Sequence, residues 1–147
     1  MSGSSSSTSY IGYYYSNVSI VLQGTINANV AGQTIWVNPT GTGSLTNSGT
    51  INVTTGALGL VPSGTGTLTN TGTIGVSGGS ITLGGAFTKA ALGTFSRTGG
   101  AVYLSGVLDN TSKTLAFDAT SGSWNLSGGT VKGGTITQSG GAKLVLT

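Results

Sequence analysis

The chain has 147 residues, of which only 5% are charged, and its net charge is +3, whereas about 25% of residues are charged in ordinary globular proteins. It contains no cysteine and no histidine, which excludes disulfide bonds, zinc and haem sites, and Ser-His or Cys-His nucleophile pairs. Its lysines and arginine are spread too thinly to form a stripe that follows a phosphate backbone. We therefore expect one domain with no cofactor, metal or nucleic-acid partner, kept soluble by Ser and Thr hydroxyls.

The N-terminal part of the sequence divides in two. Residues 1–9 (MSGSSSSTS) are rich in serine, which predicts a flexible tail. Residues 10–23 combine a cluster of aromatics with a predicted strand; they either cap the first coil or pair with another subunit by strand addition. The apolar run at 18–22 is too short to span a membrane, so membrane insertion is not expected. The candidate assembly residues of this segment are Tyr13, Tyr14, Tyr15, Val18 and Ile20.

Residues 24–83 repeat with a period of about 23 residues, as the phrase LTNSGTINV at 45–53 returns as LTNTGTIGV at 68–76. Apolar residues alternate with small polar ones, which is the period of a half-buried strand, and no 3.6-residue stripe persists long enough for a helix. One such unit cannot bury its apolar face, but stacked units can. We therefore predict an all-β, parallel β-solenoid over residues 24–147, of about five coils, with strands roughly 4.8 Å apart.

Apolar residues that lie one period apart are predicted to stack as internal ladders. Two of these ladders run through three coils. A charge placed in such a ladder would be buried without a partner, so Leu58→Asp is expected to be among the most damaging substitutions. The predicted ladders are Ile35, Leu58 and Ile81; Val37, Leu60 and Leu83; Leu45 and Leu68; Ile51 and Ile74; and Val53 and Val76.

The period loosens after residue 84. The segment AFTKAALGTFSRT carries extra residues, from which we predict that Phe95 takes the ladder position of Leu45 and Leu68. Alternation persists after residue 99, with Trp124 assigned to the core, but the sequence leaves the register of these later strands open.

The sequence ends within a predicted strand that contains Leu144 and Leu146 and has no polar cap. An uncovered last coil would present unpaired backbone groups and an apolar layer. We expect this coil to be covered either by further coils of a longer chain or by another molecule. If the other molecule is a second copy, a head-to-tail homopolymer would follow.

Asn47 and Asn70 have the parity of the ladder residues and are predicted to point inward at a bend, one coil apart. Their amides could hydrogen-bond along the stack and to the turn backbone. A structural asparagine ladder is therefore favoured over a ligand site.

The outward positions next to these asparagines carry rows of Thr and Ser, at residues 42–50 and again at 65–73. A flat grid of hydroxyls at strand spacing could order water, as an ice-binding face does. The favoured interpretation is that Thr combines a high strand propensity with solubility on an exposed sheet.

Trp36 lies between two ladder residues and is predicted to face outward, and Tyr103 is placed in the same way. Exposed aromatic rings can stack on sugar rings, which makes both residues possible contacts for surface glycans. Single exposed aromatics are nevertheless common.

Asp109 and Asp118, with Arg97 and Lys113 nearby in sequence, are the only residues available for acid-base chemistry. Polysaccharide-cleaving enzymes use paired carboxylates. Two separated aspartates in loops are better explained as solvated charges, so no catalytic residue is assigned.

The phrases at 45–53 and 68–76 resemble the repeats of large exported bacterial β-helix proteins, namely autotransporter passengers and filamentous-haemagglutinin-type adhesins. This resemblance implies a right-handed β-helix, an extracellular or bacterial cell-surface location, and a role in adhesion or a biofilm matrix. The expected function is accordingly a non-enzymatic structural or adhesive solenoid that forms fibres or part of a longer surface rod. A glycan- or ice-binding module is the alternative, and a polysaccharide-cleaving enzyme is less favoured.

Overall fold

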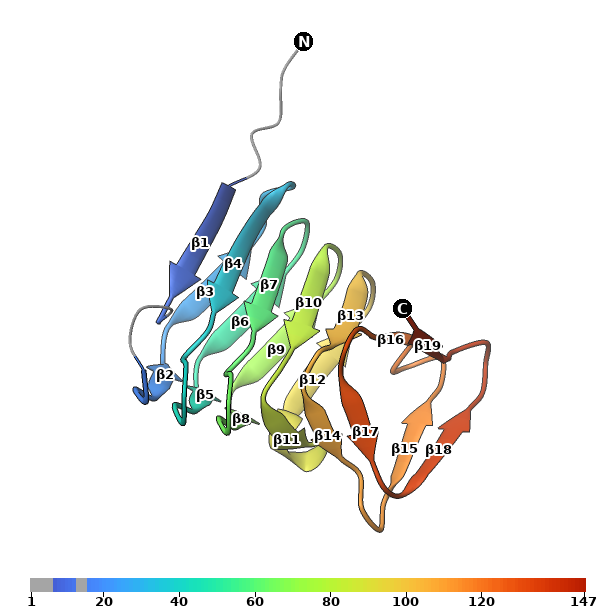
Figure 1. Cartoon of the computed structure of the whole chain (residues 1–147). Coiled ribbons are helices and arrows are strands. Elements are labelled where there is room, and N and C mark those ends of the chain that lie inside the picture. The colour runs from blue at the N-terminus through green and yellow to red at the C-terminus, as the bar shows by residue number, and fades with distance from the viewer. Residues whose placement is uncertain (1–6, 13–15) are drawn as a thin grey trace.

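The computed structural model describes residues 7–12 and 16–147, which form strands β1 to β19 and one 3-10 turn (Figure 1). All the strand pairs are parallel, and each joins a strand to the equivalent strand one coil later. The described residues thus form a β-solenoid of about six turns with a repeat of about 23 residues. The predicted fold class is confirmed.

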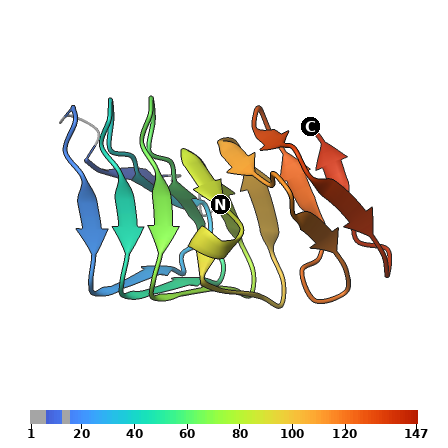
Figure 2. The same ribbon diagram turned by 90° about the horizontal axis from the view of Figure 1, so that it is seen from below.

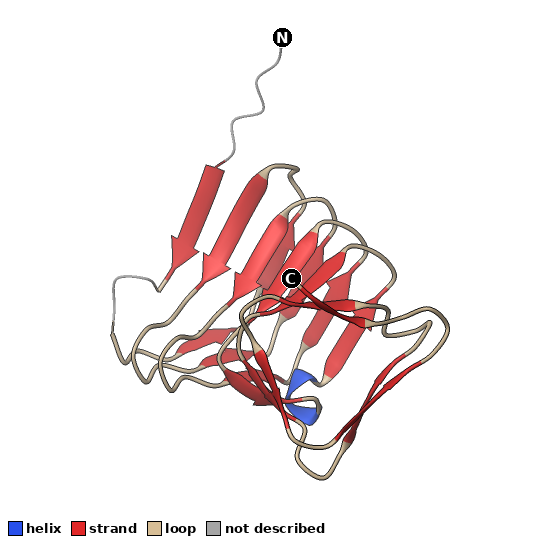
Figure 3. Ribbon diagram, turned by 45° about the vertical axis from the view of Figure 1, so that its right-hand side comes forward, coloured by secondary structure: helices blue, strands red, loops and turns tan. Residues whose placement is uncertain are grey.

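Three walls surround the interior (Figure 3). The first wall is one continuous seven-stranded sheet. Its strands are β1 (Ser7–Ile11), β4 (Gln33–Val37), β7 (Ala57–Leu60), β10 (Ser80–Leu83), β13 (Ala101–Leu104), β16 (Trp124–Leu126) and β19 (Leu144–Leu146).

The second wall contains two three-stranded sheets, which the bridge between Thr67 and Ala86 joins. Its strands are β2 (Ile20–Leu22), β5 (Leu45–Asn47), β8 (Leu68–Asn70), β11 (Ala86–Thr88), β14 (Val107–Asp109) and β17 (Thr130–Lys132).

The third wall is divided, because its four-stranded sheet ends at β12 and a separate two-stranded sheet begins at β15. Figure 2 shows β3, β6 and β9 of this wall side by side, in blue, teal and green. The strands are β3 (Thr25–Ala28), β6 (Thr50–Val53), β9 (Thr73–Val76), β12 (Thr94–Arg97), β15 (Thr114–Phe117) and β18 (Thr135–Gln138).

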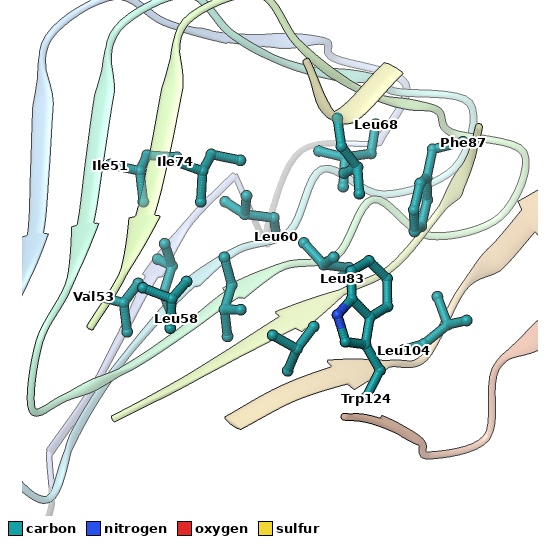
Figure 4. Packing of buried hydrophobic residues seen from close by; sticks show 14 of the residues in the cluster. Ile51, Val53, Leu58, Leu60, Leu68, Ile74, Leu83, Phe87, Leu104 and Trp124 are labelled. Carbon is teal, nitrogen blue, oxygen red and sulfur yellow. The ribbon is translucent and has the colours of Figure 1, made fainter. Parts of the chain in front are cut away.

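The core consists of inward columns that run along the stack, and the predicted ladders are confirmed. Ile35 lies beside Leu58, and Leu58 beside Ile81. Most of these side chains are completely buried (Figure 4), and burial of one Leu or Ile side chain stabilises a fold by about 1.5–3 kcal/mol. In the first wall, the two columns continue through Val102, Trp124 and Leu144, and through Leu104, Leu126 and Leu146.

The solenoid begins earlier than the sequence predicts. Residues 7–9, assigned to a flexible tail, lie in β1, and β2 lies in the segment 10–23 that was assigned to a cap or an assembly strand. Both strands precede residue 24, where the predicted solenoid begins. The repeat is hidden here because Ser9 occupies the position that Ile35 fills in the next coil. A small polar residue is tolerated at this position because β1 is an exposed strand at the end of the stack.

The prediction for Phe95 is wrong. Phe95 pairs with Ile74 of the third wall, and it is Phe87 that follows Leu68 in the second wall. The corner after β10 consists only of Gly84 and Gly85, and is shorter than the corresponding corner between β7 and β8. The extra residues lie at the next corner, where η1 (Ala90–Leu92) separates β11 from β12. A shortening and an insertion at neighbouring corners therefore shift the register within this coil.

Candidate functional site

The asparagine ladder is confirmed as a structural element. Asn47 and Asn70 are buried in register, and the Asn47 Nδ2 donates to the Asn70 Oδ1 over 2.7 Å. The Asn70 Nδ2 donates in turn to the carbonyl oxygen of Leu92 over 2.7 Å. These amides satisfy backbone and side-chain groups at a buried corner, so they offer little to a ligand.

Asn110 is a further buried corner asparagine, which the sequence analysis did not identify. It ends the second-wall segment two coils after Asn70, and its Nδ2 donates to the carbonyl oxygen of Thr135 over 3.1 Å. The sequence did carry a signal for this role. Asn110 comes directly after the strand that contains Leu108, just as Asn47 and Asn70 are the last residues of their strands. The coil between Asn70 and Asn110 has η1 at this corner and no asparagine. The link between Asn70 and Asn110 was therefore not apparent from the sequence.

The rows of Thr and Ser do not form the flat grid that the sequence suggested. Thr46 and Thr69 lie in register on the second wall, whereas Thr50 and Thr73 lie in register on the third. The asparagine corner separates the two walls, so the hydroxyl rows turn through it. This geometry weakens the ice-binding interpretation, which requires one extended plane.

The two aspartates lie apart and are held in the ionised form. A hydrogen bond from the Thr111 side chain, followed by one from its backbone N–H, lowers the pKa of Asp109. Hydrogen bonds from the backbone and side chain of Ser121 lower the pKa of Asp118. The two residues line different hollows of the surface. Neither has the raised pKa of a general acid, and they do not form the carboxylate pair of a glycosidase.

A cavity of about 470 Å³ opens where the third wall is divided. Trp124 lines it together with Phe95 and Phe117, whose ring centroids lie 5.8 and 5.9 Å from that of Trp124. Trp124 is buried, so its predicted place in the core is confirmed. The remaining lining includes Leu92, Leu115, Lys89, Arg97, Asp118 and Ser121.

The polar groups of this cavity are engaged only in part by its own walls, because the Arg97 Nε and the Trp124 Nε1 are buried without a hydrogen-bond partner. Arg97 donates to the carbonyl oxygens of Gly100 and Ser121 over 2.6 and 3.3 Å. The Asp118 Oδ1 accepts hydrogen bonds from Thr120 and Ser121. The cluster of aromatic rings in this lining can hold an apolar group.

The outward aromatics form part of one column on the first wall. Trp36 lies in register between Tyr10 and Gly59, and Tyr103 lies further along the same column, beside Thr82. Trp36 and Tyr103 are both partly exposed, as predicted. The six-membered ring of Trp36 covers Gly59, so that a Cβ atom at Gly59 would collide with it.

The candidate assembly residues lie near the ends of the stack. Val18 is exposed, whereas Ile20 is half-buried and pairs with Leu45 of its own chain. Leu144 is half-buried beside Trp124, and Leu146 is 78% exposed. The remaining candidates, Tyr13, Tyr14 and Tyr15, lie outside the described residues.

Comparison with known proteins found no matching family model, no matching curated protein and no matching solved structure. No helix among the described residues is long and apolar enough to cross a membrane. Within the same part of the chain, His, Cys, Asp and Glu form no group of three or more that could hold a metal ion.

Proposed function

We propose that this chain is a non-enzymatic structural solenoid whose two ends stack on further copies, head to tail, to build a filament. The observation that carries the proposal is that, among the described residues, each of the three walls has at least one inward column with a partly exposed apolar side chain at both ends of the stack. A head-to-tail contact between such ends is heterologous and open, which gives a filament rather than a closed oligomer.

The end residues match column by column. In the first wall, Ile11 begins the column that Leu146 ends. In the second wall, Ile20 is the first residue of the apolar column and Val131 is at its far end. A copy stacked in the same orientation would extend these columns without a change of register.

The third wall also has an apolar residue at each end, although it is divided into two separate sheets. Ile26 begins its apolar column, and Ile136, which pairs with Leu115, lies at the far end. Ile136 is exposed and Ile26 is half-buried. All three walls therefore offer an apolar residue at each end for a stacked copy to cover.

The outer strand edges are also suited to pairing. Among the described strands, β1 pairs with β4 alone and β19 pairs with β16 alone. Neither outer strand contains a charged residue, although charges and prolines are the usual protection of a strand edge. Because β1 and β2 pair with their own chain, the proposed contact uses the outer edges of these strands, without detaching the N-terminal segment.

The proposed location is extracellular or on a bacterial cell surface, in an adhesive layer or biofilm matrix. Support comes from the resemblance of the two repeat phrases to exported adhesins and from the low charge of the chain. A polysaccharide-cleaving enzyme is less well supported, because Asp109 and Asp118 lie apart with lowered pKa values.

The test compares two exposed apolar residues. Leu146→Asp places a charge on the end of the stack, whereas Val107→Asp places one on a side wall, where Val107 is 41% exposed. Sedimentation velocity and electron micrographs should show filaments for the native chain and for Val107→Asp, and folded monomers for Leu146→Asp. A native chain that stays monomeric at high concentration would contradict the proposal, as would a longer chain whose own coils cover both ends.

A further inference from the structure

The first wall differs from the rest of the surface because none of the residues in its seven strands is charged. Charged side chains lie instead on other parts of the coil, such as Arg97 in β12, Asp109 in β14 and Lys132 in β17. The outward side chains of the first wall are hydroxyls, aromatics, an amide, small residues and, in β19, the exposed Val145. A ligand for this wall is therefore expected to be neutral and rich in hydroxyl groups.

Trp36 is held in a defined position on this wall. Its six-membered ring covers Gly59, and a Cβ atom at that position would run into the ring atoms Cε3, Cζ3 and Cδ2. Gly59 itself is buried, while Trp36 remains partly exposed. The absence of a side chain at position 59 thus lets the indole lie against the backbone of the next coil, with its remaining surface facing outward.

Further aromatic rings lie in the same outward column. Tyr10 is next to Trp36 and is 55% exposed. Tyr103 lies three strands beyond Trp36, or roughly 14 Å at the usual strand spacing, with Gly59 and Thr82 between them. The column therefore forms a line of rings and hydroxyls parallel to the solenoid axis.

We propose that this column binds an extended neutral polysaccharide that runs along the solenoid axis. Pyranose rings present flat C–H surfaces that pack on aromatic faces, and aromatic side chains with one polar end suit such a partly wet contact. Trp36 supplies the central stacking surface and Tyr103 a second one, while Thr82 and Asn125 can bond sugar hydroxyls. This inference uses a side wall and does not depend on end-to-end stacking.

The binding test uses microcrystalline cellulose, chitin and a soluble β-glucan as neutral probes, with polygalacturonate as the charged comparison. The native chain should bind at least one neutral probe more tightly than polygalacturonate. Trp36→Ala should lower that affinity about tenfold, which is the size expected for loss of one aromatic stacking contact. Val107→Ala, on the second wall, should leave it unchanged.

Gly59→Ala tests whether the contact between the Trp36 ring and Gly59 positions the ring for binding. The added methyl group should displace the Trp36 ring and weaken binding, although Gly59 itself contacts no sugar. If Gly59→Ala also destabilises the chain, the double variant Trp36→Ala with Gly59→Ala should recover stability, because the colliding ring is then gone. The double variant should bind as weakly as Trp36→Ala alone.

Fluorescence gives an independent readout, because the chain has only two tryptophans and Trp124 is buried. A bound neutral glycan should change the emission of Trp36 and leave that of Trp124 unaltered, so Trp36→Phe should abolish the change. The proposal is overturned if no neutral probe binds, if Trp36→Ala binds as tightly as the native chain, or if Trp36→Ala removes only lateral association between copies.

Discussion

Ile11 and Leu146 occupy the same inward column of the first wall, at its opposite ends. Ile11 is 39% exposed and Leu146 is 78% exposed, whereas Leu60 and Leu83 in the middle of the column are fully buried. The column is thus closed along its length and open at both ends. A stacked copy would remove both apolar ends from water, which is favourable by about 25 cal/mol for each Å² of apolar surface covered.

Leu58→Asp should unfold the chain or destabilise it by several kcal/mol, because a carboxylate would be buried without a partner between Ile35 and Ile81. Thermal unfolding followed by circular dichroism measures the loss. Ser77→Asp, on an exposed turn, is the matched control and should change stability by less than about 0.5 kcal/mol. A folded Leu58→Asp with native stability would contradict the assigned register.

Asn70→Leu should cost about 1–3 kcal/mol, because the carbonyl oxygen of Leu92 would lose the Asn70 amide. The Asn47 amide would lose its shortest hydrogen bond but keep the carbonyl oxygens of Gly49 and Thr73. Denaturant titration measures the change. The control is Asn52→Ala, since Asn52 makes a similar bond to Asn27 on the exposed face and should contribute little. An equal loss of stability at the two positions would show that the buried asparagine ladder contributes no more than an exposed asparagine pair.

The two aspartates should make stability depend on pH in acid. Hydrogen bonds depress the folded-state pKa of Asp109 and Asp118 below the ordinary value of 3.8. A depressed pKa contributes stability above the unfolded-state value, and this is lost as the pH falls through the folded-state value. The melting temperature should therefore stay level near neutral pH and fall below pH 3.8.

Asp118→Asn should reduce this acid dependence, because Asp118 accepts the hydrogen bonds of its own loop. Melting temperatures of the native chain and the variant, measured from pH 2 to pH 8, provide the comparison. A native chain whose stability falls between pH 5 and pH 8 would show that some other group controls the transition.

The sequence predicted the middle of the solenoid well, because strict alternation and a constant repeat place Leu58 and Ile74 on inward positions without reference to the rest of the chain. The prediction of strand register was wrong where the number of residues between corners changes. Phe95 was misplaced because a shortened corner at Gly84 and an insertion at η1 nearly compensate, and counting residues cannot separate the two changes.

Functional features were visible only in part. The outward direction of Trp36 followed from alternation, but its contact with Gly59 joins residues one coil apart. A glycine one repeat after a tryptophan was the available signal, since glycine within a strand often marks a close approach. The divided third wall and its cavity had no sequence signal, because they arise from the different paths of two corners.

Head-to-tail stacking is tested most directly by cross-linking, because the native chain has no cysteine. Within one chain Ile11 and Leu146 lie at opposite ends of the seven-stranded sheet, six strand steps or about 29 Å apart, far beyond disulfide reach. In stacked copies they would become neighbours. The variant with Ile11→Cys and Leu146→Cys should therefore form a ladder of disulfide-linked multimers on mild oxidation, while Ile11→Cys with Val107→Cys should not. A double variant that stays monomeric, or one that multimerises no more than this control, would contradict the account.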